Sequence, residues 1–160
     1  MQIDSTRFGA IEIRDDAVLT FPDGIIGLPG ARWVLLAQSE GSAFLWLHSV
    51  DDPSIALPVT SPWLFFSDYE VEVSDEDAAR LGLEHAEQAE IFCVVRATEQ
   101  LEDFTVNLRG PIVVHVEQRV GRQVINTAAD YNVRQPLFAQ VELSEVRPGT
   151  SSAPLAATGV

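Results

Sequence analysis

The hydrophobic positions of the chain recur in short runs separated by turn residues, a pattern that predicts β-strands. Residues 43–50 carry bulky side chains at alternating positions on both faces, and residues 112–116 form a β-branched run. Such segments add up to ten or eleven expected strands. They fall at about 7–13, 17–21, 33–37, 43–50, 55–60, 69–73, 91–97, 105–108, 112–116 and 122–126, with 131–138 closing the ordered part.

Only residues 74–82 predict a helix. Ser74 can cap its first turn, the acids at 75–77 favour the positive N-terminal end, and Gly82 can end it. The predicted fold class is therefore all-β: a strongly bent antiparallel sheet forming a barrel-like single domain with one short helix. Small and polar residues replace the large apolar ones from 139 onward. This composition predicts a domain at 1–138 and a loose C-terminal tail at 139–160.

Two Gly/Pro segments mark turns. Within residues 105–116, Asn107 precedes an Arg-Gly-Pro corner, where its amide can bond local backbone groups. A positive φ at Gly110 would make a change to Val costly there through backbone strain. The loop at 22–30 is too apolar for a simple linker, so Ile25 and Leu28 are expected to close one end of the core.

The charge distribution narrows the possible partners. The formal charge is −14, and twelve of the 24 acids lie within residues 68–103 against only two arginines. Such a field repels phosphate backbones and attracts basic proteins, which disfavours direct nucleic-acid binding. A merely solubilising acidic surface explains the charge equally well. No apolar run is long enough to span a membrane and no secretory signal is recognisable, which favours a cytoplasmic protein.

Residues with catalytic or metal-binding potential do not form a recognisable pattern. His48, His85 and His115 share no metal-ligand spacing with Cys93 or the acids. Cys93 is the only cysteine, so no internal disulfide can form, and its apolar neighbours predict a small buried side chain. No nucleophile elbow or phosphate-binding loop is present. The sequence therefore predicts no catalytic residues, no metal, no cofactor and no enzyme activity.

Several motifs, taken in order, resemble the FliW family of flagellar assembly factors, and they cover about residues 3–138. The motifs are Phe-Pro-Asp-Gly-Ile-Ile-Gly-Leu at 21–28, Leu-His-Ser-Val at 47–50, the aromatic segment 61–69, Thr-Val-Asn-Leu-Arg-Gly-Pro-Ile at 105–112, Gly-Arg-Gln at 121–123 and Tyr-Asn-Val-Arg-Gln-Pro-Leu-Phe at 131–138. Ile26 and Leu28 depart from the residues usual in that family, Pro and Phe. These two changes could alter the first loop.

The resemblance implies a cytoplasmic protein without enzyme activity that binds flagellin and the translational regulator CsrA. In that family FliW holds CsrA away from flagellin messenger RNA, and newly made flagellin competes for FliW. Two alternatives stay open. One is a flagellin-specific chaperone without regulator binding. The other is a small-ligand-binding or hydrolytic β-barrel, which would require a deep pocket with convergent polar groups.

The partner-binding surface is predicted where exposed acids and aromatic residues occur together, since acids speed encounter and aromatic anchors supply affinity. The predicted binding residues are Phe66, Asp68, Tyr69, Glu70, Glu72, Glu102 and Asp103, with Asn107 and Arg109 nearby if the strands pair as expected. Should this acidic face be only solubilising, the interface is expected around Arg109, Arg119 and Arg134 instead.

Overall fold

A computed structural model describes residues 1–138 of the chain, which form eleven strands, one α-helix and four 3₁₀ turns. The strands are β1 (Gln2–Ser5), β2 (Gly9–Glu12), β3 (Leu19–Thr20), β4 (Arg32–Leu36), β5 (Phe44–Ser49), β6 (Ala56–Thr60), β7 (Ala89–Arg96), β8 (Thr105–Val106), β9 (Ile112–His115), β10 (Val120–Gln123) and β11 (Gln135–Pro136). The helix α1 spans Asp75–Leu81, and the 3₁₀ turns lie at Asp15–Ala17, Pro62–Leu64, Ala86–Gln88 and Leu101–Asp103. The predicted tail at 139–160 lies outside the described residues.

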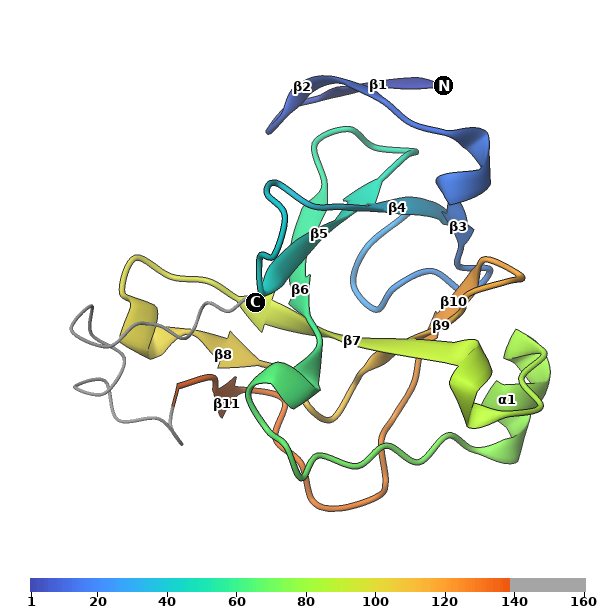
Figure 1. Cartoon of the computed structure of the whole chain (residues 1–160), viewed down its shortest axis with the longest axis vertical. Coiled ribbons are helices and arrows are strands. Elements are labelled where there is room, and N and C mark those ends of the chain that lie inside the picture. Colours follow the sequence, from blue (N-terminus) through green and yellow to red (C-terminus); the bar gives the residue numbers. More distant parts are fainter. Residues whose placement is uncertain (139–160) are drawn as a thin grey trace.

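The main sheet curls until its strands form a closed ring of hydrogen bonds (Figure 1). The ring runs β7-β6-β5-β4-β3-β10-β9 and closes because β9 also pairs with β7. β8 pairs with the last residues of β7, and β11 pairs with β8, so these two short strands extend the sheet outside the ring. The predicted barrel-like all-β fold with one short helix is confirmed. One detail differs, because the pairing of β3 with β10 is parallel.

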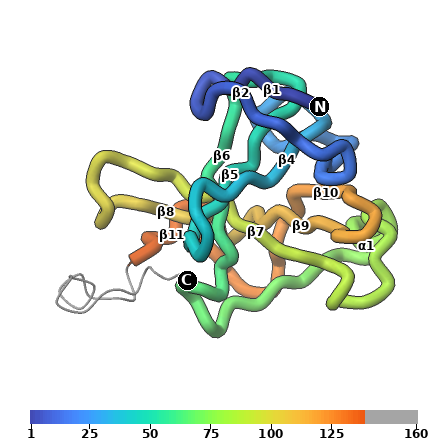
Figure 2. Tube along the Cα trace, turned by 45° about the horizontal axis from the view of Figure 1, so that its top comes forward, coloured from blue at the N-terminus to red at the C-terminus, as the bar shows by residue number. Residues whose placement is uncertain are grey.

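Strands β1 and β2 form a separate antiparallel hairpin that lies over one end of the ring (Figures 1 and 2). Ile3 packs with Ile13 on Val34 beneath it. A polar contact also holds the hairpin, since Ser5 Oγ lies 2.7 Å from Nε2 of the fully buried His48. The other ring nitrogen, Nδ1, lies 2.7 Å from the Ser49 carbonyl oxygen and therefore carries the proton.

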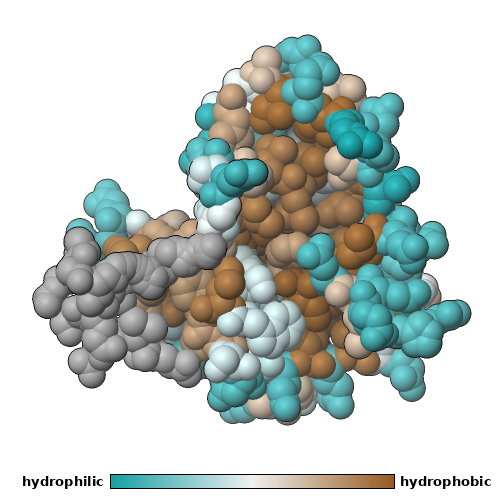
Figure 3. All heavy atoms as spheres, viewed as in Figure 1, coloured by the Kyte–Doolittle hydropathy of each residue, from teal (hydrophilic) through white to brown (hydrophobic). Residues whose placement is uncertain are grey.

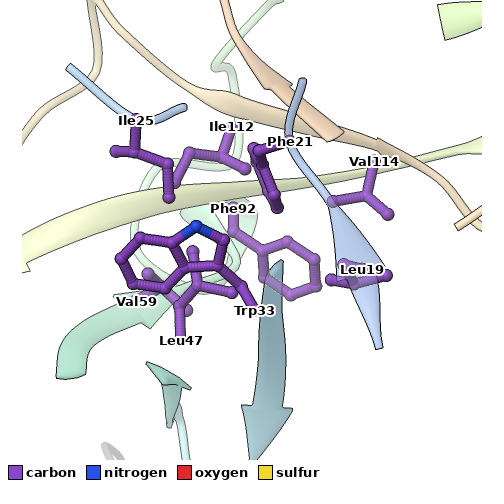
Figure 4. Close-up of a cluster of buried hydrophobic side chains, with 9 residues drawn as sticks. All are labelled: Leu19, Phe21, Ile25, Trp33, Leu47, Val59, Phe92, Ile112 and Val114. Carbon is purple, nitrogen blue, oxygen red and sulfur yellow. The ribbon is translucent and has the colours of Figure 1, made fainter. Parts of the chain in front are cut away.

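Aromatic and branched side chains fill the inside of the ring. Trp33 and Phe21 are completely buried, and Figure 4 shows Trp33 beside Phe92 in the middle of the cluster, with Ile25 at its edge. Ile25 belongs to the loop after β3 and is 4% exposed. The expectation that Ile25 helps to close one end of the core is confirmed, with Leu28 half-buried against the same cluster.

The helix forms as the sequence predicts. The Ser74 hydroxyl accepts a hydrogen bond from the Asp77 backbone N–H at 3.1 Å, and Gly82 ends the helix with φ of +72°. Leu81 is buried against Val113 and Val124, which fixes α1 beside β9 and β10. The helix is thus capped at both ends and packed on one side.

Several local expectations are wrong. Residues 69–73 are not a strand, because their backbone is held by side chains: the Glu70 N–H donates to the Tyr131 hydroxyl and the Glu72 N–H to Asn126 Oδ1. The hairpin strand at Gln2–Ser5 was not expected. Gly110 does not have a positive φ; a Cβ there would instead lie 3.1 Å from Asn107 Nδ2. Close approach, and not strain in φ, explains a glycine at this corner.

Candidate protein-binding site

A surface cavity of about 380 Å³ lies where four of the motifs singled out in the sequence meet. The loop at 25–28 forms one wall, the corner after β8 contributes Asn107, and β10 contributes Gln123. Segment 131–138 adds Val133 and Arg134. Segments separated by up to about a hundred positions in the chain therefore build one pocket, which we call the motif pocket.

The pocket opens because two strands of the ring separate. β6 pairs with β7 only at Val59–Val94 and Thr60–Cys93. Two residues further along each strand stand Leu57 and Arg96. They would face each other if the pairing continued, but they line the pocket instead. Arg96 pairs across to Thr105 of β8 on the other edge of β7. The pocket thus lies where β7 has lost β6 as a neighbour on one edge and pairs with β8 on the other.

The loop wall is shaped by two glycines. Gly24 and Gly27 have φ of +71° and +84°, which lets the chain double back so that the Leu28 N–H donates to the Ile25 carbonyl at 2.9 Å. Ile25 enters the core, whereas Ile26 is 73% exposed. An aliphatic side chain is therefore held at the rim of the pocket by a loop that is anchored from below.

Gln123 connects the loop to the corner. Its Oε1 accepts a hydrogen bond from the Ile26 backbone N–H at 3.1 Å, and its Nε2 donates to the Gly110 carbonyl at 3.0 Å. A single half-buried amide therefore sets the distance between the two walls of the pocket. This glutamine stands in the Gly-Arg-Gln motif at 121–123, and no local pattern in the sequence indicates its role.

Asn107 folds the corner as the sequence predicted. Its Oδ1 accepts from the Arg109 N–H at 3.1 Å and the Gly110 N–H at 2.8 Å. These two bonds orient the amide so that its NH₂ group points away from the Arg109 and Gly110 N–H groups. Within residues 1–138 the NH₂ group donates to no protein acceptor. A half-buried donor thus lines the pocket beside Arg96 and Arg134.

The charge of the pocket is opposite to that of the chain. Its lining contains two arginines, Arg96 and Arg134, and no Asp or Glu. Neither arginine forms an ion pair with any residue in the described range. The acid beside the loop, Asp23, is already paired with Arg122. Two arginines without an ion-pair partner among residues 1–138 therefore line one cavity in a protein of net charge −14.

Two of the predicted binding residues are not at the surface. Phe66 and Tyr69 are each 4% exposed, so the expectation that they form exposed aromatic anchors is wrong. The Tyr69 hydroxyl donates to the Leu108 carbonyl at 2.6 Å and accepts from Asn126 Nδ2 at 3.1 Å. Burial, with the nearby Cys93 adding to it, raises the pKa of Tyr69, so this phenol stays neutral. Its role is to hold three segments together.

The predicted acids are exposed but do not gather. Asp68, Glu70 and Glu72 lie on the segment that runs along the bottom of Figure 1 to α1, whereas Glu102 and Asp103 lie in the 3₁₀ turn before β8 at the left. Arg109 follows Leu108, which contacts Tyr69, so the corner does lie near the segment that carries these first acids. Arg109 itself lies 3.8 Å from Asp130 and does not line the motif pocket.

The aromatic segment places the ring of Trp63 at the surface, in place of Phe66 and Tyr69. Trp63 is 42% exposed, its Nε1 donates to the Tyr69 carbonyl at 2.8 Å, and the neighbouring Leu64 is 54% exposed. Pro62 begins the 3₁₀ turn that turns these two side chains outward. Sequence reasoning missed them because hydrophobicity alone does not separate the inner from the outer side of such a short turn.

The described residues contain no group of three or more His, Cys, Asp or Glu side chains placed to hold a metal ion. None of their helices is long and apolar enough to cross a membrane. Burial raises the pKa of the Cys93 thiol to about 12, so this thiol is not a reactive nucleophile at neutral pH. The inside of the ring is filled by buried side chains.

Fold and site together define the class as a curled, barrel-like all-β protein with an arginine-bearing pocket on its surface. Comparison with known proteins identifies the family, because the protein-family model described as "FliW protein" matches residues 2–137 of this chain. The chain therefore belongs to the FliW family.

Relatives named flagellar assembly factor FliW include proteins from Magnetococcus marinus and Natranaerobius thermophilus. The first is 40% identical over 149 residues, covering 92% of this chain and 91% of the relative. The second is 37% identical over 140 residues, covering 86% and 93%. A crystal structure of the flagellar assembly factor FliW superposes with a TM-score of 0.80 at 29% identity, covering 89% of this chain and all of that one.

Proposed function

We propose that this chain is a flagellar assembly factor that binds flagellin and the translational regulator CsrA, and that it antagonises CsrA repression of flagellin translation. The proposal also includes a cytoplasmic location, no enzyme activity, and no direct contact with nucleic acid or membrane. Membership in the FliW family supports it most, since the match extends over nearly the whole described range. The observation from the fold that supports a binding role is the motif pocket, where separate family motifs meet.

The electrostatics fit the regulatory part of the proposal. A protein that holds RNA must present basic groups to the phosphates. A partner of net charge −14 is attracted to such groups and, once bound beside them, repels RNA. The exposed acids of segment 68–103 supply this charge, although the site that fixes a partner is a different one.

The proposal is tested with the full chain and the CsrA and flagellin of the same genome. Titration calorimetry should show binding of both proteins. In a gel-shift assay, the chain should reduce the complex of CsrA with the flagellin messenger RNA leader, and added flagellin should restore that complex. Binding of flagellin alone would establish the chaperone alternative. Binding of neither protein would refute the proposed function.

A further inference from the structure

The motif pocket combines features that recognise a particular kind of peptide. Ile26 and Val133 expose 73% and 58% of their surface at its rim, while Leu28 and Leu57 line its inside. Arg96, Arg134 and the Asn107 amide add N–H donors to this apolar surface. The lining is apolar, offers several N–H donors and contains no Asp or Glu. Such a surface complements an apolar ligand that carries a carboxylate.

We propose that the motif pocket binds an acid-bearing apolar peptide segment of a partner protein, with the side-chain carboxylate of an Asp or Glu placed between Arg96 and Arg134. The proposal rests on the proposed function, since it assumes that the chain is a protein-binding module, and it names the chemistry of the segment that the module takes.

Charge complementarity selects this occupant. Arg96 and Arg134 have no ion-pair partner in the described range, so a carboxylate bound between them would offset the repulsion between their positive charges. An arginine can also hold a carboxylate through two parallel hydrogen bonds. The net charge of the chain is −14, so an acidic partner segment is repelled by the overall field and attracted only where positive charges gather, as at this site. The pocket therefore gives specificity as well as affinity.

The aliphatic wall restricts the neighbours of that carboxylate. Ile26 is presented by a loop that Gln123 and Ile25 hold in place, so the apolar rim is formed before the partner arrives. A preformed rim lowers the entropy cost of binding. The partner segment should consequently carry aliphatic or aromatic side chains on either side of its acid.

Phage display tests this without prior choice of a partner. A library of random dodecapeptides is selected against the full chain, and in parallel against the double variant Arg96→Glu/Arg134→Glu. Arg14→Glu serves as the control, since Arg14 is exposed, lies outside the pocket and pairs only with Asp16 among the described residues. Both variants change only exposed side chains, and thermal unfolding verifies that each is folded.

The expected result is enrichment of peptides with an Asp or Glu flanked by apolar residues on the parent and on Arg14→Glu, but not on the double variant. A synthetic copy of a selected peptide should bind the double variant about tenfold or more weakly, and changing its acid to the matching amide should cost a similar factor. Enrichment of acid-free peptides, equal enrichment on the double variant, or no enrichment would overturn the proposal.

Two other occupants have distinct outcomes, and each also overturns the proposal. Inorganic phosphate is the probe for a small anion: a rise in the unfolding temperature of the parent but not of the double variant, with no acid-bearing peptides selected, would identify a small-anion site. A dimer in sedimentation that the double variant abolishes would identify a second copy of this chain as the occupant. Acid-bearing peptides selected by a chain that binds neither flagellin nor CsrA would leave the pocket chemistry intact and refute only the proposed function.

Discussion

The acidic segment 68–103 and the motif pocket are both charged, yet only one of them is organised to hold a ligand. Most acids of the segment are exposed and are spread over a loop, α1, β7 and a 3₁₀ turn, while the rings of Phe66 and Tyr69 are buried inside the protein. The pocket has just two charges, but these converge on one cavity beside exposed aliphatic groups. A high density of charge along the sequence therefore indicates only a long-range electrostatic field. A binding site is indicated by charged and apolar side chains that line one cavity.

The surface view shows a related contrast. In Figure 3 hydrophobic residues gather in the middle of the face in view, where β4–β6 lie, and hydrophilic residues surround them on the side of α1. The charged groups of α1 are partly paired: Arg122 Nε lies 2.6 Å from Asp77 Oδ1, and Arg80 pairs with Glu76 at 3.1 Å. The acidic region is thus partly neutralised by structural ion pairs, whereas Arg96 and Arg134 form none with residues 1–138.

The largest expected effect comes from a substitution that disrupts the core on which both regions depend. A Cβ at Gly121 would lie 2.3 Å from Phe21 Cζ, and Phe21 is completely enclosed. Gly121→Ala should destabilise the fold by about 1–3 kcal/mol or more through overpacking. Gly110→Ala is the comparison variant and should cost less, because its Cβ would meet only the amide ends of Asn107 and Gln123, at 3.1 and 3.2 Å. Equal urea midpoints for the two variants would contradict this account of the core.

A smaller effect separates the pocket from the rest of the fold. Gln123→Ala removes the two hydrogen bonds that join the loop at Ile26 to the corner at Gly110, and it should cost about 1–2 kcal/mol. Binding of a selected peptide should weaken as well, because the rim is no longer held. The exposed Gln118 is a suitable control, since its side chain makes no hydrogen bond within residues 1–138. Hydrogen exchange at the Ile26 amide measures the loosening directly; unchanged protection would show that Gln123 does not hold the loop.

The acidic segment should affect rate more than affinity. Reversing Glu70, Glu72, Glu102 and Asp103 to Lys should slow association with a basic partner at low salt, and the difference should shrink at high salt. Dissociation should change little, because these exposed acids are not gathered around one cavity. Stopped-flow mixing at two salt concentrations provides the measurement. Equal association rates at low salt would make the acids solubilising only.

The smallest effect concerns an acid that serves the fold. The pKa of Asp51 is lowered because the backbone N–H groups of Arg32 and Ala31 donate to its carboxylate, at 3.0 and 2.9 Å. A folded-state pKa below the unfolded value means that this stabilisation is present above about pH 4 and is lost as the pH falls through the folded value. Asp51→Asn should therefore be less stable than the parent at neutral pH, and the gap should narrow in acid. A gap that does not change with pH in urea titrations would contradict this assignment.

The sequence was sufficient for the class and the capped helix because periodicity and caps are local signals. It failed for residues 69–73, where alternation predicted a strand but the hydroxyl of Tyr131 and the amide of Asn126 hold the backbone from more than fifty positions away. The pocket could not be derived locally either. Arg96 and Arg134 lie 38 positions apart, and only the separation of β6 from β7 and the Gln123 contacts bring their surroundings together. The motifs were visible in the sequence, but their convergence depends on the tertiary fold.

The most direct test of the central claim compares the two regions with one ligand. Titration calorimetry measures the dissociation constant of one selected acid-bearing peptide for the parent, for Arg96→Glu/Arg134→Glu and for the quadruple acid-to-Lys variant. The pocket variant should bind about tenfold or more weakly, whereas the acid variant should bind at least as well as the parent. Equal binding by the parent and the pocket variant, or loss of binding in the acid variant, would contradict the claim that the motif pocket is the ligand site.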